Sequence, residues 1–92
     1  MFTGSTEKGK LVYKSAAENL VPCILELGGK CPMIVDHSTD LNYAATKCLY
    51  GKFQNAGQTC IGVDYILVPE ALQEKLENEL LKGLKKMFGI DK

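Results

Sequence analysis

The chain has 92 residues, 46% of them hydrophobic, and its 11 basic and 11 acidic side chains give a formal net charge of zero. Because a globular domain usually takes about 100 to 200 residues, these values describe one soluble domain at most and exclude a complete two-domain enzyme. Zero net charge argues against general attraction to nucleic acid or to an anionic membrane. The sequence has neither an apolar run of membrane-spanning length nor a signal-peptide core at its start. The predicted location is therefore the cytoplasm, with the interior of an organelle as the alternative.

Residues 2–3 are predicted to end a strand, and residues 5–20 to form a helix capped by Ser5 or Thr6 and ended before Pro22. Two short apolar runs follow, at residues 23–27 and 32–36, and residues 28–30 (Gly-Gly-Lys) separate them. Both runs are too short for helices, so they are predicted to be strands.

Asp40 is predicted to cap the next helix, which has the strongest apolar periodicity in the chain. Its predicted buried face consists of Leu41, Ala44, Ala45, Cys48, Leu49 and Phe53. A polar loop at residues 55–59 and a strand at residues 64–68 come next. Pro69 is predicted to begin a last helix that ends at Gly89, and the late lysines of that helix match its dipole better than they match a nucleic-acid patch. This order of elements predicts an α/β fold.

The segment FTGSTEKG (residues 2–9) turns from a strand into a helix start, where free N–H groups can bind phosphate. Gly4 and Gly9 permit close backbone approach, and Ser5 and Thr6 add hydroxyl groups. The motif is neither GxGxxG nor a P-loop, so a capped helix that binds nothing is the alternative interpretation.

Glu26 lies inside an apolar strand, on the face opposite Leu25 and Leu27. If the carboxylate is buried, desolvation suits it to act as a general base near neutral pH. The alternative, equally open from the sequence, is an edge strand whose outer face is solvated.

The four cysteines are Cys23, Cys31, Cys48 and Cys60, and no two are close enough for a CxxC motif. Reduced thiols are therefore predicted, without a metal site. Cys60 follows a loop rich in amide groups, whose N–H donors can stabilise a thiolate and an oxyanion. The other three are predicted to be small buried hydrophobes. The single histidine, His37, lies in a polar turn, so Glu26 is the candidate base for a Cys60 nucleophile.

These three segments, FTGSTEKG, LELGGK (residues 25–30) and FQNAGQTC (residues 53–60), resemble in this order the aldehyde dehydrogenase superfamily. The continuation at residues 60–65 is similar to its class-three branch, which acts on fatty and aromatic aldehydes; Gly62-Val63 stands where that branch more often has Ala-Pro.

The resemblance implies that Cys60 attacks an aldehyde and that Glu26 activates the water that hydrolyses the resulting thioester. It implies NAD as cofactor, with NADP as an alternative. Gly4, Ser5, Thr6 and Gly9 would border the dinucleotide phosphates, and the Leu27 backbone would lie near the nicotinamide. An aldehyde substrate is implied, with no nucleic acid or metal partner.

The resemblance also implies an internal fragment of the aldehyde dehydrogenase fold. Residues 1–25 would end a Rossmann-like NAD-binding domain, and residues 26–92 would begin the catalytic α/β domain. The full-length form is expected to be a homodimer, with membrane association left open, and the 92-residue chain by itself is expected to be inactive. The alternative function is a non-catalytic module that associates with other proteins through exposed strand edges.

Overall fold

The computed structural model describes residues 1–90. Its first strand, first helix and second strand form a β-α-β unit with parallel strands. Its elements are β1 (Phe2–Thr3), α1 (Thr6–Glu18) and β2 (Leu25–Glu26). The Ser5 hydroxyl accepts the Lys8 N–H at 3.3 Å and caps α1, as predicted. Leu20 takes a left-handed φ of 54° just after the helix. The chain then returns, and β2 pairs in parallel with β1.

The rest of the chain repeats this pattern and adds a long helix. It comprises β3 (Cys31–Ile34), α2 (Leu41–Phe53), the 3-10 helix η1 (Gln54–Gly57), β4 (Val63–Leu67) and α3 (Glu70–Phe88). Strands β3 and β4 are parallel. Asp40 caps α2 by accepting the Tyr43 N–H at 2.8 Å, and Gly89 ends α3 in the left-handed conformation, so both predicted helix signals are confirmed.

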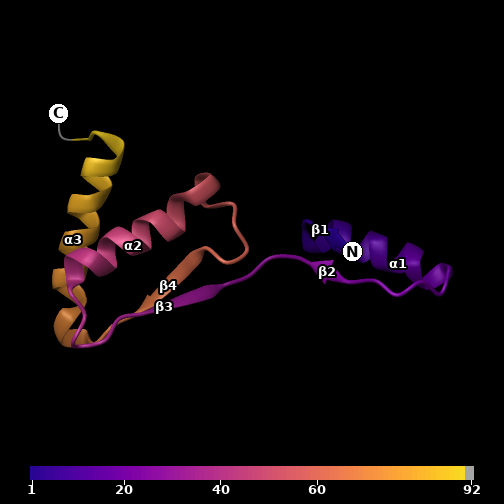
Figure 1. The fold of residues 1–92 in the computed structure, drawn as a ribbon, viewed down its shortest axis with the longest axis horizontal. Coiled ribbons are helices and arrows are strands. Elements are labelled where there is room, and N and C mark those ends of the chain that lie inside the picture. Colours follow the sequence, from indigo (N-terminus) through magenta and orange to yellow (C-terminus); the bar gives the residue numbers. More distant parts are fainter. Residues whose placement is uncertain (91–92) are drawn as a thin grey trace.

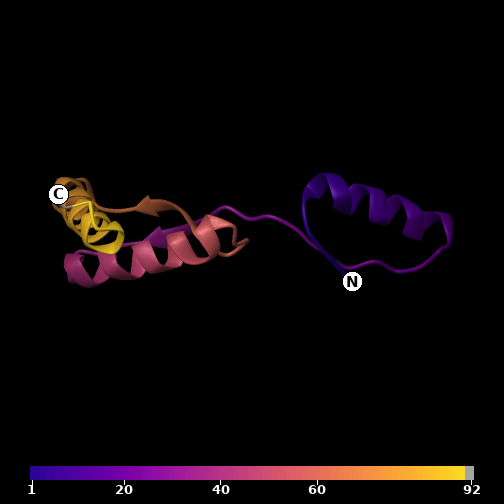
Figure 2. The same cartoon turned by 90° about the horizontal axis from the view of Figure 1, so that it is seen from above.

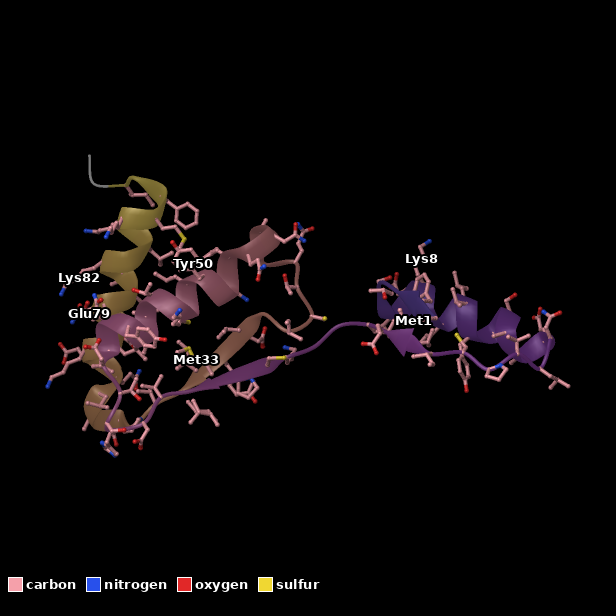
Figure 3. The ribbon with its side chains drawn as sticks, viewed as in Figure 1. Met1, Lys8, Met33, Tyr50, Glu79 and Lys82 are labelled. Carbon is pink, nitrogen blue, oxygen red and sulfur yellow. The ribbon has the colours of Figure 1, made fainter. Side chains whose placement is uncertain are left out.

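The buried apolar side chains all belong to this second unit. Val35, Ala44, Ala45 and Leu76 form a cluster between the β3–β4 pair, α2 and α3. The two alanines are small enough to let α3 pack closely on α2. Met33 reaches from β3 toward the same cluster (Figure 3). The apolar periodicity of residues 41–49 therefore marks the centre of the only buried cluster in residues 1–90.

A polar contact joins the two helices beside that cluster. The Asn42 amide on α2 donates to the Glu79 carboxylate on α3 at 3.1 Å, and the Lys82 ammonium lies 2.7 Å from the other carboxylate oxygen (Figure 3). The hydrogen bond from Lys82, and to a smaller extent that from Asn42, lowers the pKa of Glu79 below its usual value of 4.5.

We predict that Leu76→Ala destabilises the second unit by about 2–5 kcal/mol, because it leaves a cavity in this small cluster. Leu76 is 2% exposed, whereas Leu81, on the same helix, is 56% exposed. Leu81→Ala is therefore the matched control and should change stability by no more than about 0.5 kcal/mol. Urea unfolding followed by circular dichroism measures both effects, and equal losses would contradict the assignment of Leu76 to the core.

The two units lie at opposite ends of an elongated molecule (Figures 1 and 2). Its extents are 54 × 32 × 15 Å and its radius of gyration is 18.4 Å. A compact chain of this length would have a radius near 12 Å. Residues 1–30 bury only Gly9, and large apolar side chains such as Ile24, Ile34 and Ile61 are exposed. The α/β prediction is confirmed.

Four sequence-based details need correction. Pro69 is the N-cap of α3 and not its first helical residue. Part of the predicted loop at residues 55–59 is the tight turn η1, in which Asn55 and Ala56 have left-handed dihedrals. Cys23 and Cys31 are only half-buried, while Cys48 is buried as predicted. Phe53, predicted on the buried face of residues 41–53, is 39% exposed, because it lies at the last residue of α2, where that face leaves the core. No helix within the described part of the chain is long and apolar enough to cross a membrane.

Candidate active site

The three motif segments, far apart in the sequence, meet at one open cleft of about 710 Å³. Residues 3–6 contribute the β1–α1 turn, residues 27–29 contribute the chain that leaves β2, and residues 55 and 58–60 contribute the turn before β4. The cleft therefore lies between the two units, beside the segment of chain that connects them. Its lining side chains are hydroxyl, amide, thiol and leucine groups, and none of them is charged.

Cys60 stands at the end of a tight turn with unusual backbone geometry. Asn55, Ala56 and Gly57 have φ values of 50°, 57° and 77°, so three successive residues are left-handed. For a residue with a side chain this conformation costs roughly 1–2 kcal/mol. The Gln58 N–H and side-chain amide both donate to the Asn55 carbonyl, at 3.2 and 3.1 Å, and help to hold the turn. Such strain is typical of segments that aim a functional group.

The Cys60 thiol is exposed, and it is the only cysteine that lines the cleft. No carbonyl within residues 1–90 accepts the Cys60 N–H, which leaves this donor free for an oxyanion. In contrast, burial raises the pKa of the Cys48 thiol above its usual value. The sequence-based distinction between Cys60 and the buried Cys48 thus agrees with their surroundings.

Glu26 lies beside the cleft but does not line it. It pairs in register with Thr3, and its carbonyl accepts the Gly4 N–H at 3.1 Å. The side chain is exposed, so the solvated-face alternative describes the structure and the buried one does not. No ion pair or side-chain hydrogen bond holds the carboxylate within the described part of the chain.

The predicted cofactor residues divide into two groups. Gly4, Ser5, Thr6 and Leu27 line the cleft, at the amino end of α1 where anions are favoured. Gly9 does not line it; Gly9 is buried against Leu27, and a methyl group added there would lie 2.8 Å from the Leu27 Cδ2 atom. Its phosphate contact stays a prediction, and its observed role is to seat α1 on β2.

The residues at the start of α1 fit a dinucleotide phosphate by their donors and shape. The turn supplies backbone N–H groups, and the Gly4 backbone is so close to the Phe2 ring that an added Cβ would lie 2.8 Å from it. A cofactor phosphate would therefore be bound by peptide dipoles and hydroxyl groups, because the lining has no cationic side chain. No group of three His, Cys, Asp or Glu residues suited to a metal occurs in residues 1–90.

Sequence reasoning missed two residues that contact the Cys60 backbone. Gly29 approaches the Cys60 carbonyl so closely that a Cβ at position 29 would overlap its oxygen. Cys31 places its sulfur 3.5 Å from the same oxygen. The glycine pair at residues 28 and 29 was the available signal, but it was interpreted as a break between strands and as part of the LELGGK motif, and not as a contact with Cys60.

Comparison with known proteins gives one consistent result. The aldehyde dehydrogenase family model matches residues 1–91. The chain is 50% identical over 88 residues to the 4,4'-diaponeurosporen-aldehyde dehydrogenase of Staphylococcus aureus, covering 96% of this chain and 19% of that protein. It is 47% identical over 91 residues to the dimeric NADP-preferring aldehyde dehydrogenase of Rattus norvegicus, covering 99% and 20%.

A solved structure agrees with the sequence matches. Staphylococcus aureus AldH in its substrate-bound state matches with a TM-score of 0.86 and 49% identity, over 96% of this chain and 19% of that one. The chain therefore spans about a fifth of the length of the relatives it matches.

Proposed function

Since the chain belongs to the aldehyde dehydrogenase family, we propose that it contributes the nucleophile and the base of an enzyme that oxidises an aldehyde to a carboxylic acid. The family match confirms the resemblance and the fold class, which is part of the aldehyde dehydrogenase fold. The observation that carries the proposal is the cleft in which the three motif segments meet around the exposed Cys60.

In the proposed reaction the Cys60 sulfur, as thiolate, forms a bond to the aldehyde carbon. The aldehyde oxygen takes the displaced electron pair, and the free Cys60 N–H donates to it. Bound NAD would supply the acceptor for the hydride that leaves this carbon, which becomes a thioester carbon. Glu26 then takes a proton from water as the water oxygen attacks the thioester. The carbon–sulfur bond breaks and restores the Cys60 thiolate.

The cofactor contacts are proposed from the same cleft. The N–H and hydroxyl groups of Ser5 and Thr6 would bind the dinucleotide phosphates, Gly4 would border them while its own N–H bonds the Glu26 carbonyl, and Gly9 would act by holding α1 in place. The Leu27 backbone would border the nicotinamide. NAD is the proposed cofactor and NADP the alternative; the name of the rat relative supports the alternative.

The organisation of the full-length protein is likewise proposed. Residues 1–25 would form the C-terminal end of the cofactor domain, and residues 26–92 would form the beginning of the catalytic domain. The spatial separation of the two β-α-β units supports this division (Figure 1). A homodimer in the cytoplasm is the proposed assembly, and the word dimeric in the rat relative's name supports it. We propose that residues 1–92 alone do not turn over substrate, because the cleft is open on a long, thin molecule.

A segment exchange tests the proposal. Residues 1–92 would replace the matching segment of the Staphylococcus aureus relative, which is 50% identical to it. We expect the chimaera to reduce NAD in the presence of the aldehyde used by that relative, measured as absorbance of the reduced cofactor. A folded chimaera that binds NAD but reduces none would contradict the proposal and would favour a non-catalytic, protein-binding role for this chain.

A further inference from the structure

We propose that Cys31 is a positioning residue for Cys60, holding the Cys60 carbonyl through its S–H group while Gly29 packs against the same oxygen. This inference rests on the proposed role of Cys60 as the nucleophile. It concerns the direction in which the thiol and its own N–H point, and not the chemistry of the thiol itself.

The contact lies at the junction of the two β-α-β units. Cys31 begins β3 and pairs in register with Val63 of β4, and the register is irregular between Cys31 and Pro32. Its sulfur is 3.5 Å from the Cys60 oxygen, within reach of a weak S–H···O hydrogen bond. Gly29 leaves no room for a Cβ beside that oxygen. The Cys60 carbonyl is therefore confined between a donor and a backbone.

Two planar peptide groups flank the Cys60 Cα atom, and each has its own restraint. The Thr59 carbonyl accepts the Gly62 N–H at 3.0 Å. Because a peptide group is planar, this bond also fixes the Cys60 N–H, which belongs to the same plane. The Cys31 sulfur fixes the next plane through the Cys60 carbonyl. Together the two restraints set the Cys60 backbone dihedrals, and these determine where its Cβ points and which positions the sulfur can reach by rotation about the Cα–Cβ bond.

This restraint matters because the preceding turn is strained. Residues 55–57 are all left-handed, so the turn is expected to relax if the carbonyl beyond it is released. Release would rotate the Cys60 thiol away from its present position at the edge of the cleft that it lines. We therefore expect Cys31→Ala to slow alkylation of Cys60 at neutral pH, whereas Cys31→Ser, which keeps a donor, should retain it.

The experiment uses the 92-residue chain and three variants, Cys31→Ala, Cys31→Ser and Cys23→Ala. The last removes a half-buried thiol that does not contact Cys60 and serves as the matched control. NMR gives the carbonyl ¹³C shift of Cys60, and mass spectrometry gives the rate at which iodoacetamide labels it. We expect Cys31→Ala to move the shift and to lower the rate at least threefold, while the other two variants stay within twofold of the unmodified chain.

If Cys31→Ala does not fold, as judged by loss of its helical circular dichroism signal, the variants Gly28→Ala and Gly29→Ala provide a second test. Gly29→Ala pushes a methyl group against the Cys60 carbonyl, whereas a methyl group at Gly28 meets no atom within 4 Å. Gly29→Ala should slow Cys60 labelling at least threefold, and Gly28→Ala should not change the position of the carbonyl.

Three results would overturn the positioning role. They are an unchanged Cys60 shift and rate in Cys31→Ala, equal losses in Cys31→Ala and Cys31→Ser, and equal behaviour of the two glycine variants. Failure of the proposed nucleophile is a separate result: Cys60 would not be the fastest thiol even in the unmodified chain, whatever the Cys31 variants do to its carbonyl shift.

Discussion

Cys60→Ala in the chimaera is expected to lower aldehyde oxidation by about 10⁴- to 10⁶-fold, because the atom that forms the covalent intermediate is removed. Cofactor binding should persist, since the residues proposed to bind the phosphates lie on a different segment, the β1–α1 turn. Stopped-flow absorbance of reduced NAD is the measurement, and it should show neither a burst nor a steady state.

Cys23→Ala is the matched control for this prediction. Cys23 is a half-buried thiol that does not line the cleft, so its removal should leave a burst and a steady-state rate close to those of the parent. A Cys60→Ala chimaera that still forms one equivalent of reduced cofactor per site would show that another group attacks the aldehyde.

Glu26→Gln is expected to separate the two halves of the reaction. The amide has nearly the shape of the carboxylate but cannot accept a proton from water, so the steady-state rate should fall by about 10²- to 10⁴-fold. The burst, which depends on Cys60 and the cofactor, should remain at one equivalent per site. Rapid-quench mass spectrometry should find the acyl group on Cys60.

Glu18→Gln is the control for charge loss, because Glu18 is an exposed carboxylate at the end of α1. It should leave both phases unchanged. Loss of the burst in Glu26→Gln would show that Glu26 is needed before thioester hydrolysis, and an unchanged steady state would show that another base activates the water.

The sequence predicted the elements whose causes are local. Ser5 and Asp40 bond N–H groups three residues away, and Gly89 needs only its own conformational freedom, so these helix ends followed from short patterns. The apolar face of α2 was also predictable, because helical periodicity encodes it directly. The family resemblance added the identity of the three motif segments.

Features that depend on distant parts of the chain were missed or left open. The close approach of Gly29 to Cys60 joins positions 31 residues apart, and only the folded chain reveals it. Gly9 was expected at the phosphates, and that contact stays a prediction; what the sequence did not show is that Gly9 packs against Leu27. The left-handed run at residues 55–57 contains Asn55 and Gly57, which favour that conformation, but Ala56 does not.

The exposure of Glu26 depends on what surrounds β2. Strand alternation placed it correctly on the face opposite Leu25 and Leu27, but the sequence did not determine whether that face is covered. In residues 1–90 the strand has one neighbour, β1, and the Glu26 face is solvated. A parallel strand is normally buried on both faces, which made burial of Glu26 a reasonable expectation. The carboxylate is exposed because β2 belongs to a sheet of only two strands in residues 1–90.

Selective labelling of the four thiols is the most direct test of the claim that Cys60 is the activated nucleophile of this cleft. The unmodified chain would be treated with limiting iodoacetamide near neutral pH, and the labelled peptides would be quantified by mass spectrometry. We predict that Cys60 reacts first and that Cys48 reacts last, since burial raises the pKa of the Cys48 thiol and leaves less thiolate. Equal labelling of all four cysteines would contradict the claim.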